Sequence, residues 1–368
     1  MKHFIYFLLI FLTGSYGTMA QSSQYMFVSS GTKANNAGIF VYDLGADHQN
    51  ITLKHKEQKV SVSSYLTLHP SKPLLYSAGN NTLSAFSINK KDGSLSFINQ
   101  QSTGGDNPCY VSVDKTGKWA FAANYSGGSI SFFPIQDNGG LGKAKKVIKH
   151  EGSSVNKDRQ KVPHPHMIAP SPNNKFVLVP DLGADKIFIY KFDAAKGTFE
   201  ANDTPFAKAH PGAGPRHLAF HPNKNFCYVL NELNATVTVY QWDSQAGVLT
   251  SLHTYQTLPE DFKDFNKTAD IHLTENGKYL YTSNRGHNSL ALFKVNADGS
   301  LVPGDHFASG GDFPRNFFIL SNTQLVAANR KSNNMVFFDL NPKTGALTSG
   351  KNVTDIPSAQ CIKVWNGR

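Results

Sequence analysis

"HPNKNFCYVLNELNATVTVYQWDSQAGVL", residues 221–249, contains the pattern that decides the fold. A polar turn leads into an apolar segment that ends in Asn and Glu. A second polar turn follows, and another apolar segment runs to a glycine with an apolar neighbour. Short segments rich in Val, Phe and Tyr and bounded by turn residues are typical of β-strands. This stretch therefore predicts two consecutive strands.

The same order of features recurs along the chain. The closing glycine falls at seven positions, 46 to 57 residues apart: Gly45, Gly93, Gly140, Gly197, Gly247, Gly299 and Gly345. Almost no stretch carries a helical period, so we expect an all-β protein. A unit of about fifty residues suits a four-stranded sheet, and seven such units predict a seven-bladed β-propeller. We expect the last strand, residues 360–366, to pair with the N-terminal strands and close the ring, which hides the sheet edges.

The first twenty residues, "MKHFIYFLLIFLTGSYGTMA", differ from the repeats. Lys2 precedes a compact apolar segment, and small residues follow up to Ala20, which is the pattern of a secretory signal peptide. The apolar segment is too short to span a bilayer. We therefore expect a single propeller domain over residues 21–368, exported to the periplasm or secreted, with no membrane association after cleavage. An uncleaved anchor is the alternative.

The composition restricts the partners. The chain has 36 Lys and Arg residues against 26 Asp and Glu residues, a net charge of +10. The densest basic patch, residues 143–149, is typical of a solvated strand or loop, so we expect no nucleic-acid partner. Cys109, Cys227 and Cys361 are too few and too scattered for a disulfide framework or a metal site. We expect each of them in the core, and one disulfide between two of them remains open.

The inner strands of a propeller converge on a central channel, so polar residues at their ends meet in space. The corresponding segments are "HPHMIAP" (164–170), "GPRHLAF" (214–220), "TADIHLT" (268–274) and "FPRNFFI" (313–319), together with the loops after the next strands. They predict one pocket formed by His164, His166, Arg216, His217, Glu232, His272, Arg285 and Arg315. Arginine binds carboxylate or phosphate, and Glu and His transfer protons near neutral pH, so the pocket suits a small anion. We interpret Arg330, in the last of these loops, as a surface residue.

Residues 164–190, 212–240, 269–293 and 311–319 resemble the seven-bladed lactonase family, which includes bacterial 6-phosphogluconolactonase and fungal carboxy-muconate lactonizing enzyme. The likeness covers essentially the whole mature chain. It implies catalytic roles for His166 in His-Pro-His, Arg216 in Gly-Pro-Arg-His, Glu232 in Asn-Glu and Arg285 in Ser-Asn-Arg-Gly. The remaining substrate-binding candidates are His164, His217, Asn231, His272, Asn284 and Arg315. One departure is Tyr110, which stands where many relatives carry histidine in "NPCYVSV".

The leading hypothesis is hydrolysis of a sugar lactone, 6-phosphogluconolactone or a related exported lactone, without metal or cofactor. Arg216 and Arg285 would bind the anionic group and stabilise the oxyanion. Glu232 would act as general base on water, and His166 would protonate the ring oxygen. The alternatives are a carboxy-muconate-type cyclising reaction and a non-enzymatic propeller that binds a protein or glycan. We expect a small anionic lactone or carboxylate as substrate, and a monomer or weak homodimer.

Overall fold

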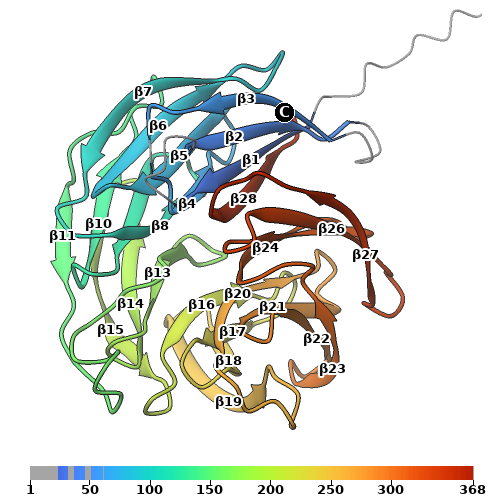
Figure 1. The fold of residues 1–368 in the computed structure, drawn as a ribbon. Helices are drawn as coiled ribbons and strands as arrows, with labels where there is room; N and C mark the ends of the chain where they lie inside the picture. The colour runs from blue at the N-terminus through green and yellow to red at the C-terminus, as the bar shows by residue number, and fades with distance from the viewer. Residues whose placement is uncertain (1–23, 32–36, 46–50, 61, 368) are drawn as a thin grey trace, which may run out of the picture.

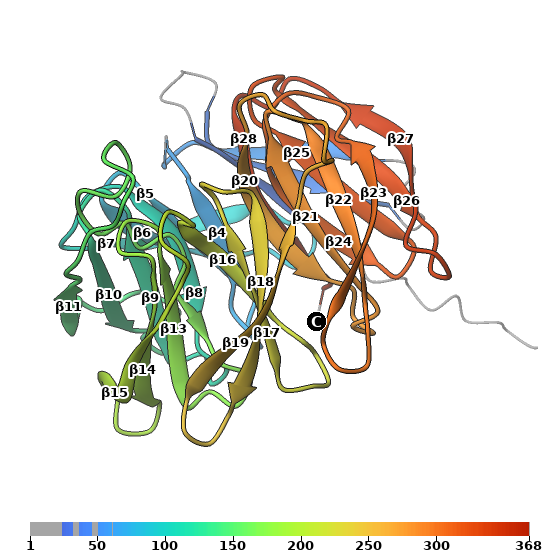
Figure 2. The same ribbon diagram turned by 90° about the horizontal axis from the view of Figure 1, so that it is seen from below.

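The computed structural model describes residues 24–31, 37–45, 51–60 and 62–367. These residues form seven four-stranded antiparallel sheets arranged radially around a central axis, and they contain no helix (Figure 1, Figure 2). The predicted seven-bladed β-propeller is therefore confirmed. No helix in this part of the chain could cross a membrane. The predicted signal peptide, residues 1–20, lies outside the described residues.

Each blade consists of four strands, and the inner strand of the first blade comes from the C-terminal end of the chain. In blade order, the strands are β28 (Ala359–Trp365), β1 (Tyr25–Ser30), β2 (Ile39–Asp43), β3 (Thr52–Glu57); β4 (Tyr65–Leu68), β5 (Leu74–Gly79), β6 (Thr82–Ile88), β7 (Leu95–Ser102); β8 (Pro108–Val113), β9 (Trp119–Asn124), β10 (Ser129–Pro134), β11 (Lys146–Lys149); β12 (Ala169–Pro170), β13 (Phe176–Asp181), β14 (Lys186–Asp193), β15 (Thr198–Lys208); β16 (Pro215–Phe220), β17 (Phe226–Asn231), β18 (Thr236–Asp243), β19 (Val248–Gln256); β20 (Lys267–Leu273), β21 (Tyr279–Arg285), β22 (Ser289–Val295), β23 (Leu301–Ala308); and β24 (Pro314–Ser321), β25 (Gln324–Asn329), β26 (Asn334–Leu340), β27 (Leu347–Val353).

The ring closes as predicted. β28 pairs antiparallel with β1, with Trp365 opposite Tyr25 and Ile362 opposite Val28. The side chain of Asn316 on β24 accepts a hydrogen bond from the backbone N–H of Ile362 at 2.8 Å, which joins the seventh blade to the first. Ring closure pairs the inner edge of β1, and this protects it from edge-to-edge association.

The glycines that mark most of the repeats lie against a side chain of the preceding blade. Gly247 has a φ of +67° and lies against the ring of Phe176 in the preceding blade, while Gly299, with a φ of +81°, lies in the same way against Phe226. In the third blade the glycine with positive φ is Gly139, one residue before the predicted Gly140. Backbone of this conformation favours glycine, so the repeat pattern records how one blade packs on the next.

Several inner strands carry a bulge at the end nearest one mouth of the channel. The pairing register of β8 shifts between Pro108 and Tyr110, and that of β16 and β24 shifts in the same way. On β28 one residue is likewise passed over in the pairing with β1. The extra residue of a bulge leaves the ladder and its side chain is redirected. The extra residues are Cys109, Arg216, Arg315 and Gln360.

Candidate active site

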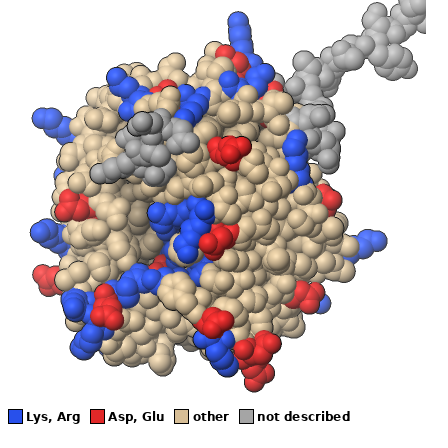
Figure 3. Space-filling model, viewed as in Figure 1, with Lys and Arg blue, Asp and Glu red and all other residues tan. Residues whose placement is uncertain are grey.

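Three of the redirected residues, Cys109, Arg315 and Gln360, line a cavity of about 350 Å³ at one mouth of the channel, which we call the central cavity. Figure 3 shows Lys and Arg side chains gathered around the hollow at the centre of this face. Among the described residues that line the central cavity, Glu232 is the sole carboxylate. The polar and charged lining includes Asn107, Arg159, His166, Glu232, Lys267, Arg285, Arg315, Arg330 and Gln360.

Glu232 lies at the centre of a cluster of charged side chains. It follows β17 directly, and its Oε2 accepts from Arg216 Nε at 3.0 Å and lies 2.9 Å from Arg285 Nη2. Its Oε1 accepts from Arg159 Nη2 at 2.8 Å. Burial alone would raise the pKa of this carboxyl, but Arg285, Arg216 and Arg159 together lower it strongly. Glu232 is therefore ionised at neutral pH and is a weak base in this arrangement.

Arg216 is fully buried, and its side chain contacts three residues. Besides Glu232, its Nη1 donates to the carbonyl oxygen of Ala269 on β20 and lies 3.2 Å from His217 Nε2. Arg285 is held similarly, with Nε donating to Lys267 O at 3.2 Å and Nη2 to Thr268 O at 2.6 Å. Both guanidinium groups are therefore oriented by the β-strands before any ligand arrives.

His166 lines the central cavity and is buried, with Nδ1 3.7 Å from the Cys109 sulfur. Burial lowers the pKa of this imidazole well below its usual value, and Arg216, His217 and Arg315 lower it further. A proton on His166 would be surrounded by guanidinium groups in a desolvated site. The side chain is therefore neutral at pH 7 and able to accept a proton.

Three cations of the central cavity have no carboxylate partner in the part of the chain that the structure describes: Lys267, Arg315 and Arg330. Arg330 Nε donates to Ser358 Oγ at 3.1 Å. Burial lowers the pKa of Arg315 to about 9, and the neighbouring Arg216, Arg285 and Arg330 contribute to this shift. Arg315 thus stays charged at neutral pH without compensation, and a ligand with negative charge would supply it.

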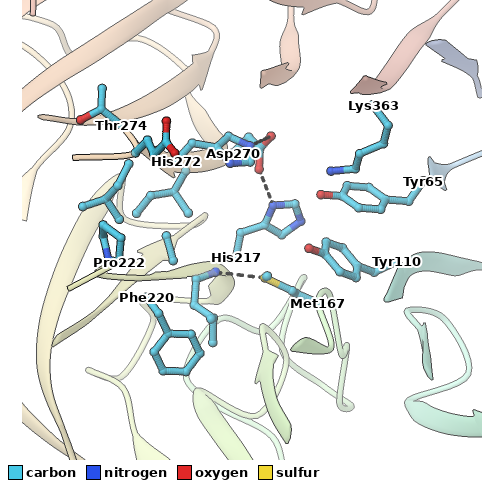
Figure 4. Close-up of a pocket in the computed structure, with 15 residues that line it drawn as sticks. Tyr65, Tyr110, Met167, His217, Phe220, Pro222, Asp270, His272, Thr274 and Lys363 are labelled. Carbon is cyan, nitrogen blue, oxygen red and sulfur yellow. Dashed lines mark hydrogen bonds and ion pairs between the residues drawn. The ribbon is translucent and has the colours of Figure 1, made fainter. Parts of the chain in front are cut away.

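A second cavity, of about 320 Å³, lies elsewhere along the inner strands and is lined by different residues. Figure 4 shows His217 between Asp270 and the stacked pair Tyr65 and Tyr110, whose ring centroids are 4.0 Å apart. His217 Nδ1 lies 2.8 Å from Asp270 Oδ1, and His272 Nε2 lies 2.9 Å from Asp270 Oδ2. His217 and His272 therefore belong to the second cavity and not to the predicted common pocket.

The reason for this separation is the bulge on β16. Arg216 leaves the ladder and pairs with Glu232 of the central cavity, while the next residue, His217, rejoins the pairing and faces the second cavity. Tyr110 follows bulged Cys109 in the same way. Tyr110 thus lines the second cavity and not the central cavity.

Three other predicted substrate-binding residues line neither cavity. His164 stacks on Tyr125 with centroids 4.5 Å apart and its Nδ1 bonds to Tyr125 O. Asn231 Nδ2 donates to the hydroxyls of Thr236 and Thr238. Asn284 exchanges hydrogen bonds with Thr257 and donates to Ser289. Each of these side chains makes hydrogen bonds within the propeller, and their predicted contact with substrate stays a prediction.

Sequence reasoning also missed several residues that line the central cavity or the second cavity. Arg159 comes from the loop between β11 and β12, where no strand period predicts the direction of a side chain. Lys267 and Arg330 line the central cavity, and Arg330 corrects its interpretation as a surface residue. Asp270 is buried by His217, His272 and Asn316. The bulges themselves have a sequence signal, because Cys109, Arg216 and Arg315 each follow a proline at the start of an inner strand.

Cys109, Cys227 and Cys361 are all buried and free. Among the described residues, no three His, Cys, Asp or Glu side chains gather as a metal site would require.

Comparison with known proteins gives a consistent result. A family model described as lactonase, 7-bladed beta-propeller, matches residues 25–364. A 6-phosphogluconolactonase of Bacillus subtilis is 33% identical over 343 residues, covering 92% of this chain and 97% of the relative. A 6-phosphogluconolactonase of Formosa agariphila is 35% identical over 334 residues, covering 88% and 94%. The solved structure of a periplasmic gluconolactonase of Pseudomonas aeruginosa is 28% identical with a TM-score of 0.86, covering 93% and 99%.

Proposed function

The chain belongs to the lactonase family of seven-bladed β-propellers, and we propose that it hydrolyses an anionic sugar lactone in the central cavity. 6-Phosphogluconolactone is the first compound to test, since two relatives carry that activity in their names. The observation that supports the proposal is the buried cluster of Arg216, Glu232 and Arg285 beside the neutral His166. It combines positive charge for an oxyanion with a base for water.

The two buried arginines stabilise the transition state in this proposal. Water attacks the carbonyl carbon of the lactone, and negative charge develops on the carbonyl oxygen. Arg216 and Arg285 supply positive charge there, and Glu232 with the backbone carbonyls of β20 holds both in place. Groups oriented in advance need no reorganisation when the charge appears, which makes such stabilisation effective.

The proton transfers go through His166. Glu232 is paired with three arginines, whereas His166 is neutral and lines the same cavity. We therefore assign the base role to His166 in place of Glu232. His166 takes a proton from the attacking water, and the C–O bond to the ring oxygen then breaks. The imidazolium is destabilised by its cationic neighbours, so it readily returns the proton to the departing oxygen.

The unpaired cations favour a substrate with negative charge away from the reacting carbonyl. Lys267, Arg315 and Arg330 line the same cavity and lack a carboxylate partner among the described residues. A phosphate group would accept several charge-assisted hydrogen bonds from them. We also propose that the protein is exported, since residues 1–20 carry the signal-peptide pattern and the P. aeruginosa relative is named as periplasmic.

The test is hydrolysis of 6-phosphogluconolactone and of glucono-lactone by the purified protein in the presence of EDTA, corrected for the spontaneous reaction. We expect kcat/KM to be at least about tenfold higher for the phosphorylated lactone, the effect of one hydrogen bond to a charged group. A folded protein that hydrolyses neither compound would refute the proposal. The cyclising reaction and a binding role would then be tested next.

Two variants separate the roles of His166 and Glu232. His166→Gln should lower kcat at least about a hundredfold, because it removes the proton acceptor. Glu232→Gln should retain more activity than His166→Gln. In the wild-type protein, kcat/KM for glucono-lactone should stay level as the pH falls from 8 to below 6.5, because the pKa of His166 is lowered. The reverse order of the two variants would return the base role to Glu232.

A further inference from the structure

The three arginines on Glu232 differ in how firmly they are held. Arg216 and Arg285 lie on β-strands, and each also donates to a backbone carbonyl. Arg159 lies on the loop between β11 and β12, and its side chain is 25% exposed, against 1% and 5% for the other two. Arg159 is therefore the partner that can leave Glu232 with the least disturbance of the propeller.

The loop that carries Arg159 is attached at its ends and open in its middle. His150 bonds to Asp181 at 2.7 Å, and the side chain of Gln160 donates to Leu182 O at 2.9 Å. Between these two anchors, residues 151–159 are exposed or half-buried. The backbone N–H of Arg159 donates to Asn156 in a turn, so the guanidinium group can change partners by rotation of its side chain without movement of the backbone.

Arg159 also has an unused donor. Its Nη2 donates to Glu232 Oε1 and to the Tyr125 hydroxyl at 3.0 Å, but its Nη1 is buried and has no hydrogen-bond partner among the described residues. A buried donor without an acceptor is unfavourable by about 1–3 kcal/mol. Glu232 offers no further help, because Arg216 and Arg285 already occupy its Oε2.

We propose that Arg159 is a substrate-binding residue that determines specificity: it exchanges Glu232 for an anionic group of the substrate. This proposal rests on the proposed function and extends it. A phosphate or carboxylate group accepts from both amino groups of a guanidinium, so the exchange satisfies Nη1 as well as Nη2. Glu232 keeps Arg216 and Arg285 in place through Oε2 during the exchange. A lactone without negative charge offers no such replacement, and Arg159 then stays on Glu232.

The test compares Arg159→Met and Arg159→Lys with the wild-type protein on 6-phosphogluconolactone and glucono-lactone. Arg159→Met should raise KM for the phosphorylated lactone by about tenfold to a hundredfold, the loss of a hydrogen bond to a charged group, and should change KM for glucono-lactone less than about twofold. Arg159→Lys should be intermediate, because it keeps the charge without the planar pair of donors. Lys157→Gln, an exposed residue of the same loop, is the charge-matched control and should affect neither substrate.

Equal effects of Arg159→Met on the two lactones, or no effect on either, would overturn the proposal. If the wild-type protein hydrolyses neither lactone, the proposed function fails, and Arg159 is tested by calorimetric titration with 6-phosphogluconate and inorganic phosphate. Binding that weakens at least about tenfold in Arg159→Met and not in Lys157→Gln would still support the anion contact. Binding that is the same in both variants would exclude it. Circular dichroism and thermal unfolding of each variant establish that the fold is retained.

Discussion

Asp270 orients His217, which is one of the three residues that position the Arg216 side chain. Burial opposes ionisation of Asp270, but the contacts with His272 and His217 hold the pKa of its carboxyl well below the usual range. The ionised carboxylate accepts the Nδ1–H of His217, so His217 Nε2 carries the lone pair and accepts from Arg216 Nη1. Burial lowers the pKa of His217 to about 3, with Arg216 the next cause, so the imidazole stays neutral.

Asp270→Asn should disturb this arrangement without touching the central cavity. An asparagine presents both a donor and an acceptor, so it no longer fixes the tautomer of His217. If Arg216 moves by about 1 Å, kcat for the lactone should fall about a hundredfold, while KM changes much less. His217→Gln and the double variant complete a thermodynamic cycle. Because both residues act on Arg216 in series, their effects should be non-additive.

Glu275→Gln, an exposed residue of the second cavity, is the control for Asp270→Asn and should leave kcat unchanged. Strictly additive effects of Asp270→Asn and His217→Gln would contradict the serial arrangement. A large change in KM with constant kcat would do the same, because it would point to a direct contact with substrate.

At the residue scale, the sequence predicted the chemical types of the site residues well, but it predicted poorly the direction in which their side chains point. It brought Arg216, Glu232 and Arg285 to one place, and the structure joins them by ion pairs. It also assigned Asn231 and Asn284 to the site, although the Asn231 amide bonds within its own blade and the Asn284 amide bonds to Thr257, directly after the preceding blade. A strand period does not reveal whether an amide at a strand end faces the channel or the adjacent turn, because both have the same local sequence.

At the scale of elements, the bulges of the inner strands decide which side chains reach the central cavity. Pro108, Pro215 and Pro314 each precede an extra residue that leaves the ladder. Proline cannot donate a backbone hydrogen bond, so it is found where a ladder begins or is interrupted. The Pro-X signal is visible in the sequence, but the loop of Arg159 has no comparable pattern, and so its contribution could not be predicted.

The interblade glycines allow a test of a single packing contact. Gly247→Ala should lower the free energy of unfolding by about 1–2 kcal/mol from its φ of +67° alone. The new Cβ would also lie 2.4 Å from Phe176 Cε1, so the ring or the turn must move. Equilibrium urea unfolding measures the change. Gly350→Ala, in exposed strand β27 without a positive φ, is the control and should have a much smaller effect. Equal losses in the two variants would contradict the packing role.

For the whole molecule, the seven blades could be predicted because each repeat carries its own turn, strands and glycine. Ring closure could also be predicted, since one strand was left over at the C-terminus and one was missing from the first blade. The division of the channel into two cavities could not, because it depends on which residue of each inner strand leaves the ladder at a bulge. Of two adjacent residues, Arg216 pairs with Glu232 of the central cavity, whereas His217 lines the second cavity.

The buried histidines of the channel make the stability of the whole propeller depend on pH. His166 and His217 stay neutral in the folded protein because burial and nearby guanidinium groups lower their pKa values. In the unfolded chain both imidazoles take up a proton near pH 6.5. Unfolding therefore takes up protons below that pH. Above pH 6.5 the two histidines do not reduce the free energy of unfolding. Below pH 6.5 they reduce it progressively, as the pH falls toward their lowered pKa values in the folded protein.

Asp270 and Glu232 do not oppose this pH dependence of the free energy of unfolding between pH 6.5 and 5. Their carboxyls stay ionised in the folded protein because their pKa values are lowered. In the unfolded chain, carboxyls titrate nearer pH 4. Over this range, each histidine that is neutral in the folded protein should lower the free energy of unfolding by up to about 1.4 kcal/mol for each unit by which the pH falls. Urea unfolding at several pH values measures this slope. His217→Gln should reduce the slope by the contribution of one histidine. His253→Gln, which changes an exposed residue of β19, should leave the slope unchanged. An unchanged slope in His217→Gln would show that His217 is protonated in the folded protein and cannot accept from Arg216.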